Sequence, residues 1–260
     1  DRADLGAWRA WVDYPLPLQG QGALRGWVDV GERRGGRESV RDVSITAAVA
    51  LHAVNTRLGA ELPALQLARI EGRLSAERHA DGFELATRQL ALETGDGLRV
   101  VPTDFDLRVR EAHGTEAAQG SLRANRLDFG ALAALAAHLP FEDAVRERLA
   151  AFDPKGELGA LRLEWRGEPA APQAWTLSAS FAGLGLAARD GLPGLGGLSG
   201  RVEGNERAGR FHLDSRNAHV DLPEVVGASR LAFDVMRADG GWQRREGRLE
   251  IALDSASFDN

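Results

Sequence analysis

The sequence has no cysteine, which excludes disulfide bonds, thiol catalysis and thiolate metal sites. Lysine is nearly absent as well: Lys155 is the one lysine among the 32 basic residues, and we attribute this arginine bias to genome composition rather than to a site. Positive charge does not dominate, because the net charge at pH 7 is -6. That balance argues against an electrostatic interface with nucleic acid.

Long apolar runs are missing too. The longest stretch without charge, residues 169–188, is interrupted by Gln173, Thr176 and Ser178, so it is not expected to span a bilayer. No segment has the pattern of a signal peptide. The chain opens without methionine, and a strand-like pattern continues up to Asn260. We therefore expect one continuous unit cut from a longer protein.

The pattern that is present is an alternation of apolar with polar or charged residues. Successive side chains of a strand point to opposite faces, so each alternating run predicts a strand with one apolar face. Such strands favour an antiparallel sheet that is dry on one side. The candidates for lining an apolar groove on that side are Phe105, Leu107, Val109, Leu161, Leu163, Trp165, Trp175, Leu177, Phe181, Phe211, Leu213, Leu231, Phe233, Val235, Leu249, Ile251 and Leu253.

Turn residues separate these runs. Asp81-Gly82, residues 95–97, residues 205–209 and residues 239–241 each have the composition of a tight connection. The strands would then recur roughly every 8–12 residues, as expected for a meander, a sandwich or a barrel.

One segment, residues 129–152, has helical spacing instead. Asp128 is suited to cap its N-terminus, Pro140 interrupts it, and Pro154 follows its end. Its apolar stripes predict that part of the sheet is covered by Leu135, Leu139, Val145 and Leu149. The expected organisation is a β-rich half over residues 1–128 with a short helix near 5–11, a helical insertion over 129–155, and a second β-rich half over 156–260.

No motif predicts chemistry. Residues 183–188 match a dinucleotide fingerprint, but a loop rather than a helix is expected after them. Ser199 lacks the complete spacing of a nucleophile elbow and is read as a turn residue, so a hydrolase centred on it is a distant third hypothesis. His212 and Asp214 share a strand face, but three or four converging ligands are not evident. We predict no catalytic residue, no metal site and no cofactor.

Several phrases resemble the central region of YhdP-like proteins, which are AsmA-like proteins of the Gram-negative envelope. They are LDF (127–129), FDPKGEL (152–158), LRLEW (161–165), LPGLGGLSG (192–200), GNE (204–206) and GRFHLDSR (209–216), with GQGALRGW (20–27) and LPAL (62–65) earlier in the chain. The similarity extends over nearly the whole chain. These phrases are structural, so no individual functional residue is carried across.

The resemblance implies a periplasmic, β-rich body anchored in the inner membrane by a helix that this sequence does not include. It also implies movement of phospholipid between the inner and outer membranes. The expected fold is mainly β: a long, antiparallel, curved and twisted sheet forming a taco-like apolar groove, with the helical insertion near 129–152. The expected function is that of a lipid-conduit segment whose partners are phospholipid acyl chains. The alternative is a structural or protein-binding β-sandwich module of the envelope.

Overall fold

The computed structural model describes residues 3–4, 18–35, 38–139, 141, 143–169, 171–189, 193–222 and 230–259. The short helix expected near residues 5–11 lies outside these ranges. The chain forms two compact units. The first comprises Asp1–Leu122 and Leu135–Pro140, and the second comprises Arg123–Ala134 and Phe141–Asn260.

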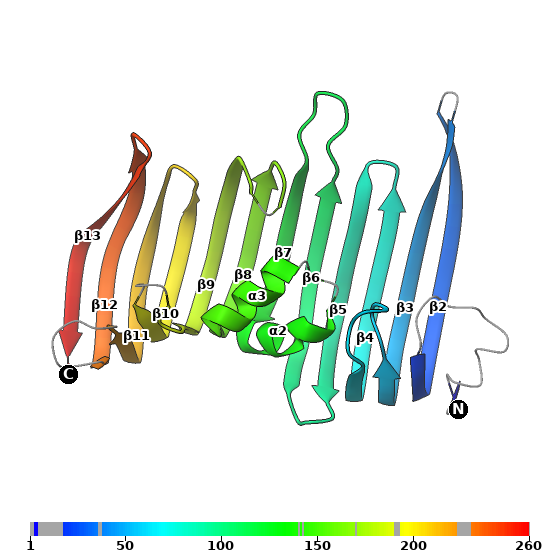
Figure 1. The fold of residues 1–260 in the computed structure, drawn as a ribbon, viewed down its shortest axis with the longest axis horizontal. Helices are drawn as coiled ribbons and strands as arrows, with labels where there is room; N and C mark the ends of the chain where they lie inside the picture. Colours follow the sequence, from blue (N-terminus) through cyan, green and yellow to red (C-terminus); the bar gives the residue numbers. More distant parts are fainter. Residues whose placement is uncertain are drawn as a thin grey trace. The chain divides into compact units, whose positions relative to one another are not determined.

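Both units consist mainly of long strands, which confirms the predicted fold class of a mainly β, antiparallel, open sheet with one helical insertion (Figure 1). The strands of the first unit are β1 (Ala3–Asp4), β2 (Leu18–Gly35), β3 (Glu38–Thr56), β4 (Leu65–His79), β5 (Gly82–Thr94) and β6 (Arg99–Arg110). Those of the second unit are β8 (Lys155–Arg166), β9 (Ala174–Leu186), β10 (Gly194–Asn205), β11 (Ala208–Asp221), β12 (Arg230–Arg245) and β13 (Arg248–Asp259). The division between the units falls within β7 (Gln119–Asp128).

Within each unit, strands pair antiparallel with their neighbours in the chain. Three of the four predicted turns are confirmed, because strands end and begin around Asp81-Gly82, residues 95–97 and residues 205–209. The prediction for residues 239–241 is wrong, since they lie inside β12 and pair with both β11 and β13. Gly240 is needed there for close approach: a Cβ would lie 2.8 Å from Cζ of Phe211.

Bulges change the phase of the alternation within the strands. Ala53, Gln89 and Asn217 have φ angles of +50°, +52° and +54°, a backbone conformation uncommon for residues with a Cβ. On either side of Ala53, Leu51 and Val54 are both buried, although strict alternation would place them on opposite faces. A bulge adds one residue to a strand and so lets both ends present apolar side chains to the same side.

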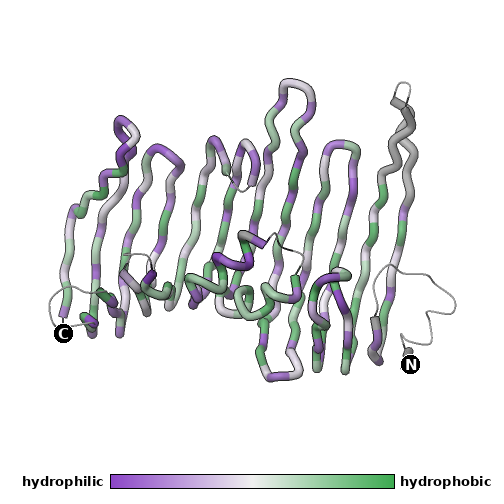
Figure 2. Tube along the Cα trace, viewed as in Figure 1, coloured by the Kyte–Doolittle hydropathy of each residue, from purple (hydrophilic) through white to green (hydrophobic). Residues whose placement is uncertain are grey.

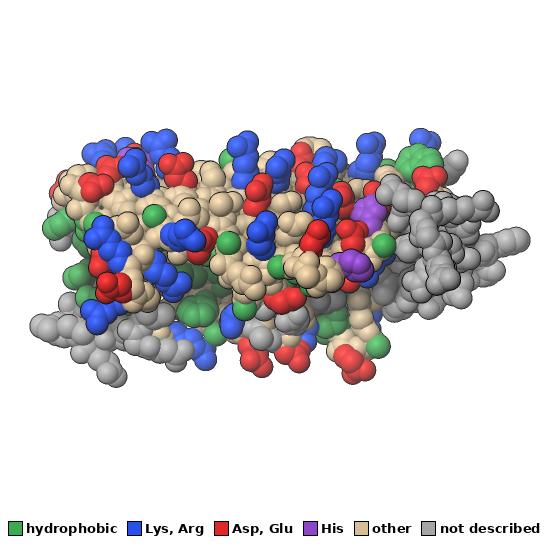
Figure 3. Space-filling model, turned by 90° about the horizontal axis from the view of Figure 1, so that it is seen from above, with side chains coloured by type: hydrophobic (Ala, Val, Ile, Leu, Met, Phe, Trp, Pro, Cys, Tyr) green, Lys and Arg blue, Asp and Glu red, His purple; other side chains and the backbone are tan. Residues whose placement is uncertain are grey.

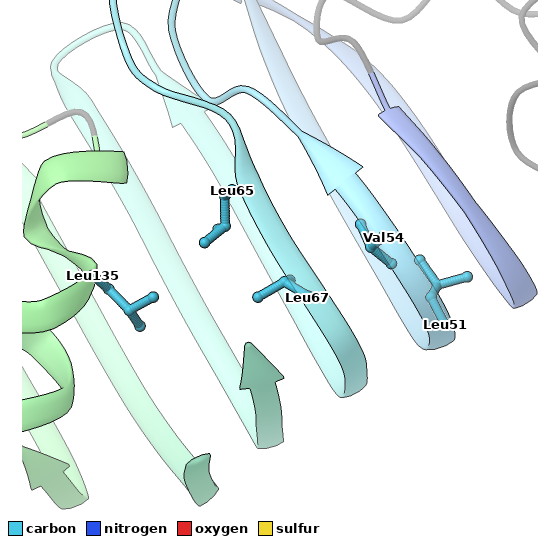
Figure 4. Close-up of a cluster of buried hydrophobic side chains, with 5 residues drawn as sticks. All are labelled: Leu51, Val54, Leu65, Leu67 and Leu135. Carbon is cyan, nitrogen blue, oxygen red and sulfur yellow. The ribbon is translucent and has the colours of Figure 1, made fainter. Parts of the chain in front are cut away.

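The helical insertion consists of α2 (Phe129–Leu135), a 3-10 turn η1 (Ala136–His138) and α3 (Asp143–Phe152). The predicted cap is confirmed, because the N–H of Ala131 donates a hydrogen bond to Oδ1 of Asp128 over 2.9 Å. In the first unit, Leu135 points toward Leu65 and Leu67 and completes a buried cluster with Leu51 and Val54 (Figure 4).

The two apolar stripes of the insertion differ in burial. Leu139 packs against the same cluster as Leu135, as predicted. The second stripe is covered less completely than predicted, because Val145 on α3 is 37% exposed and Leu149 is half-buried. The first stripe therefore covers part of a sheet, whereas the second is only partly covered.

Neither unit has the interior of a β-sandwich. Among the described residues, the largest completely buried side chains are Thr87 and Ser215, which are small and polar. Large apolar side chains also stay accessible, among them Val28 on β2, Ile45 on β3 and Ile251 on β13, which are between 46% and 67% exposed. Apolar surface that a closed sandwich would bury therefore remains in contact with water.

Candidate apolar contact face

In the second unit, the strand register brings apolar residues into continuous rows. Three neighbouring rows across β9 to β13 contain only apolar residues and glycine: Ala179–Val202–Phe211–Gly240–Leu253, Leu177–Gly204–Gly209–Trp242–Ile251 and Phe181–Gly200–Leu213–Ala238–Ala256. On β8, Leu163 pairs with Leu177 and Trp165 pairs with Trp175. Cross-strand partners share a face, so these residues form one surface, which we call the second apolar face.

The rows in between hold polar and charged residues and therefore belong to the opposite side of the sheet. The clearest is Ser180–Arg201–His212–Asp239–Ser255. Nδ1 of His212 lies 2.7 Å from Oδ1 of Asp239, and this hydrogen bond holds the pKa of Asp239 below its ordinary value. Figure 2 shows the same alternation of hydrophobic and hydrophilic residues along the strands.

The polar side does not assemble a metal site. Asp214 pairs with Arg237 over 3.3 Å, and Asp221 pairs with Arg230 over 2.6 Å. The hydrogen bond from Arg230 lowers the pKa of Asp221. His212 is thus joined to Asp239 rather than to Asp214. Within the ranges that the structure describes, no group of three or more His, Cys, Asp or Glu side chains is placed to hold a metal ion.

The first unit has a comparable surface, which we call the first apolar face. Its rows include Val28–Ile45–Ala76–Leu85–Leu107 and Gly26–Ala47–Leu74–Thr87–Phe105. Val109 pairs with Phe83, whose other partner is Arg78. Charged pairs again occupy the opposite side, where Arg108 contacts Glu84 over 3.1 Å. The predicted candidates Phe105, Leu107 and Val109 therefore share one face.

The remaining candidates lie on β8 and β11 to β13. Leu161 is almost completely buried, Leu231 pairs with Val220, and Phe233 contacts Phe258 edge-on with ring centroids 5.7 Å apart. Val235 is the exception, because its partners are the charged residues Arg216 and Asp259. The neighbouring Met236 pairs instead with Ser215 and Phe258.

Several residues on the second apolar face were absent from the sequence-based candidates. The register adds Ala179, Val202, Ala238, Trp242 and Phe258. Trp242 was not among the candidates because the preceding Gly240-Gly241 was interpreted as part of a turn. The alternation of the run 175–181 already places Ala179 on the apolar side, but the candidates were restricted to larger side chains.

Large apolar side chains remain accessible at β13. Leu249, Ile251, Leu253 and Phe258 are between 60% and 67% exposed. Soluble monomers rarely leave such residues contiguous and uncovered unless the patch binds something. The second apolar face is therefore a candidate contact surface for an apolar partner.

A sequence model of the YhdP protein family matches residues 1–260. The chain belongs to the YhdP family. This membership confirms the resemblance found in the sequence, and the apolar faces are those of a YhdP-family sheet. No curated protein and no solved structure matches the chain. Where the structure is described, no helix combines the length and apolar character needed to cross a membrane.

The two motifs weighed above for chemistry lie in or next to β9 and β10 of this YhdP-family chain. The interpretation of Ser199 as a turn residue is wrong, because Ser199 lies within β10, where its Oγ accepts a hydrogen bond from the N–H of Gly183 over 3.1 Å. Its own N–H donates to Oγ of Ser215 over 3.0 Å, and that hydroxyl donates to the carbonyl of Ser199 over 3.2 Å. The fingerprint-like residues 183–188 run from the end of β9, and no helix follows them among the described residues.

Proposed function

We propose that this chain is a segment of a lipid conduit, and that its apolar faces bind phospholipid acyl chains passively, without chemistry. The observation that carries the proposal is the set of three charge-free rows across β9 to β13. Family membership supports it, because the resemblance to YhdP-like proteins implies phospholipid movement between the inner and outer membranes. The periplasm is accordingly the proposed location.

Acyl chains suit these rows for an energetic reason. Burying one CH₂ group yields about 0.8 kcal/mol, so a chain of about 16 carbons could gain roughly 10 kcal/mol before its entropy losses. The exposed residues of β13 would lose contact with water at the same time. Binding by many weak apolar contacts therefore needs no polar recognition group on the rows.

The same rows would also let an acyl chain move along the face. Aliphatic and aromatic contacts are non-directional. An acyl chain that shifts by one carbon therefore replaces the contacts it loses with similar new ones. A charge in the path would oppose such sliding, because it would have to be desolvated as the acyl chain passes over it. In the second unit the charges lie in the alternate rows, such as Arg201 and Asp239.

Native mass spectrometry of the purified chain, followed by solvent extraction of lipid, tests the proposal. We expect phospholipid to accompany the folded protein and to be displaced by added phospholipid of a distinguishable mass. A protein that carries no lipid and takes up none from added phospholipid would contradict the proposal. Recovery of a tightly bound envelope protein in its place would support the alternative of a protein-binding module.

A further inference from the structure

Three tryptophans form a band at one end of the second apolar face. Trp165 pairs with Trp175, and the rings of Trp175 and Trp242 are stacked with centroids 6.5 Å apart and planes 28° from parallel. β9 and β12 are separated by β10 and β11, so the ring of Trp242 has to reach across two strands. We call these three residues the tryptophan band.

Glycines make this reach possible. A Cβ at Gly204 would lie 2.6 Å from the ring of Trp242, and one at Gly209 would lie 2.1 Å from it. The ring thus lies directly on the backbone of β10 and β11. Its Nε1 donates a hydrogen bond to the carbonyl of Asn205 over 3.2 Å, which fixes the ring near the β10–β11 turn. The band is a built feature of the face rather than a chance grouping.

Trp165 differs from Trp242 in its hydrogen bonding. Its Nε1 is buried and has no acceptor within the described part of the chain. A buried indole N–H without an acceptor costs about 1–3 kcal/mol, so such groups usually have a partner. Because this nitrogen is covered by the protein itself, it does not meet a ligand that approaches the face, and the band offers such a ligand its aromatic rings.

The tryptophan band lies where the second apolar face ends and arginines begin. On the inner side of the Trp242–Ile251 pair lie Gly240 and Leu253, and on the outer side Arg244 pairs with Leu249. The adjoining turns and strand ends contain five arginines and three glutamates: Arg166, Arg207, Arg244, Arg245 and Arg248 against Glu168, Glu206 and Glu246, of which Arg207 and Glu206 pair over 3.4 Å. Figure 3 looks down on the turn ends of the strands, where basic and acidic side chains gather.

We propose that a diacyl glycerophospholipid lies on the second apolar face with its ester carbonyls at the tryptophan band. Its acyl chains extend over the rows of Leu177 and Phe211, and its phosphate points toward Arg244. Tryptophan suits this level because its ring is apolar while its N–H is polar. This assignment rests on the proposed function and adds the orientation of the lipid.

Fluorescence quenching by brominated phospholipids tests the orientation. In a variant whose other tryptophans, Trp8, Trp11 and Trp27, are replaced by Phe, bromines placed close to the ester should quench the band more strongly than bromines near the methyl end. Stronger quenching from the methyl end would overturn the orientation while leaving lipid binding intact. Absence of quenching by either lipid, in a variant with the wild-type circular dichroism spectrum, would overturn the proposed function as well.

Discussion

Leu163→Asp is the substitution that most directly separates an accessible apolar face from a closed core. Leu163 is half-buried and pairs with Leu177 on the second apolar face, whereas its neighbour Arg162 is exposed and pairs with Ser178 on the other side. Complete burial of a leucine is worth about 1.5–3 kcal/mol, so losing half of that contact should cost about 1 kcal/mol. The new carboxylate stays partly hydrated, and we expect a total loss of about 2–3 kcal/mol, far below that of a fully buried charge.

The assay for Leu163→Asp is urea unfolding followed by circular dichroism, combined with lipid uptake measured by native mass spectrometry. The variant should remain folded and should bind much less phospholipid. Arg162→Asp is the matched control, because it places the same carboxylate one residue away on the polar side, and it should retain both folding and lipid. Global unfolding of Leu163→Asp in the absence of urea, or lipid binding equal to that of the control, would refute this reasoning.

Three further outcomes are expected. Leu135→Ala should lower the free energy of unfolding by about 2–4 kcal/mol because it opens a cavity in the cluster with Leu65 and Leu67, while Val145→Ala should change it by less than about 0.5 kcal/mol; urea titration of both variants measures the difference, and equal effects would contradict the packing. Gly209→Ala should displace the ring of Trp242 and abolish the near-ultraviolet circular dichroism of the Trp175–Trp242 stack. Gly26→Ala should leave that signal unchanged, because the atom nearest to its new Cβ would be the carbonyl oxygen of Thr46, 3.7 Å away. Asp221 and Asp239 have folded-state pKa values below their ordinary values, so they stabilise the protein above the unfolded-state pKa of about 3.9. This stability is lost as the pH falls through the folded-state pKa. Thermal melting at decreasing pH should show a falling melting temperature, and Asp239→Asn should make that fall less steep.

The sequence correctly predicts the fold class and, for most strands, which side chains lie on the apolar face. Alternation alone places both Leu163 and Leu177 on an apolar face, because β8 and β9 are regular around these residues. The two residues prove to be cross-strand partners. The cap at Asp128 and the packing of Leu135 also follow from local patterns, since capping and helical periodicity depend on residues close in sequence.

Bulges and close backbone approaches set the limits of that prediction. Asn217 has a positive φ, and on either side of it Ser215 and Ala218 are both buried, so the pattern in β11 does not keep a period of two. Gly240 resembles a turn residue in the sequence, but its role is to leave room for Phe211 on the adjacent strand. Neither feature is a property of one strand alone, because each depends on the register with a neighbour.

The central claim is that lipid lies on one defined face of the strands, and site-specific photo-cross-linking along β9 tests it most directly. A photoreactive residue is introduced at each position from 176 to 181 in turn, and lipid adducts are detected by mass spectrometry. Positions 177, 179 and 181, which belong to the apolar rows, should cross-link to phospholipid, while positions 176, 178 and 180 should not. Adducts of equal yield at all six positions, adducts only at the even positions, or none at any position would contradict the account.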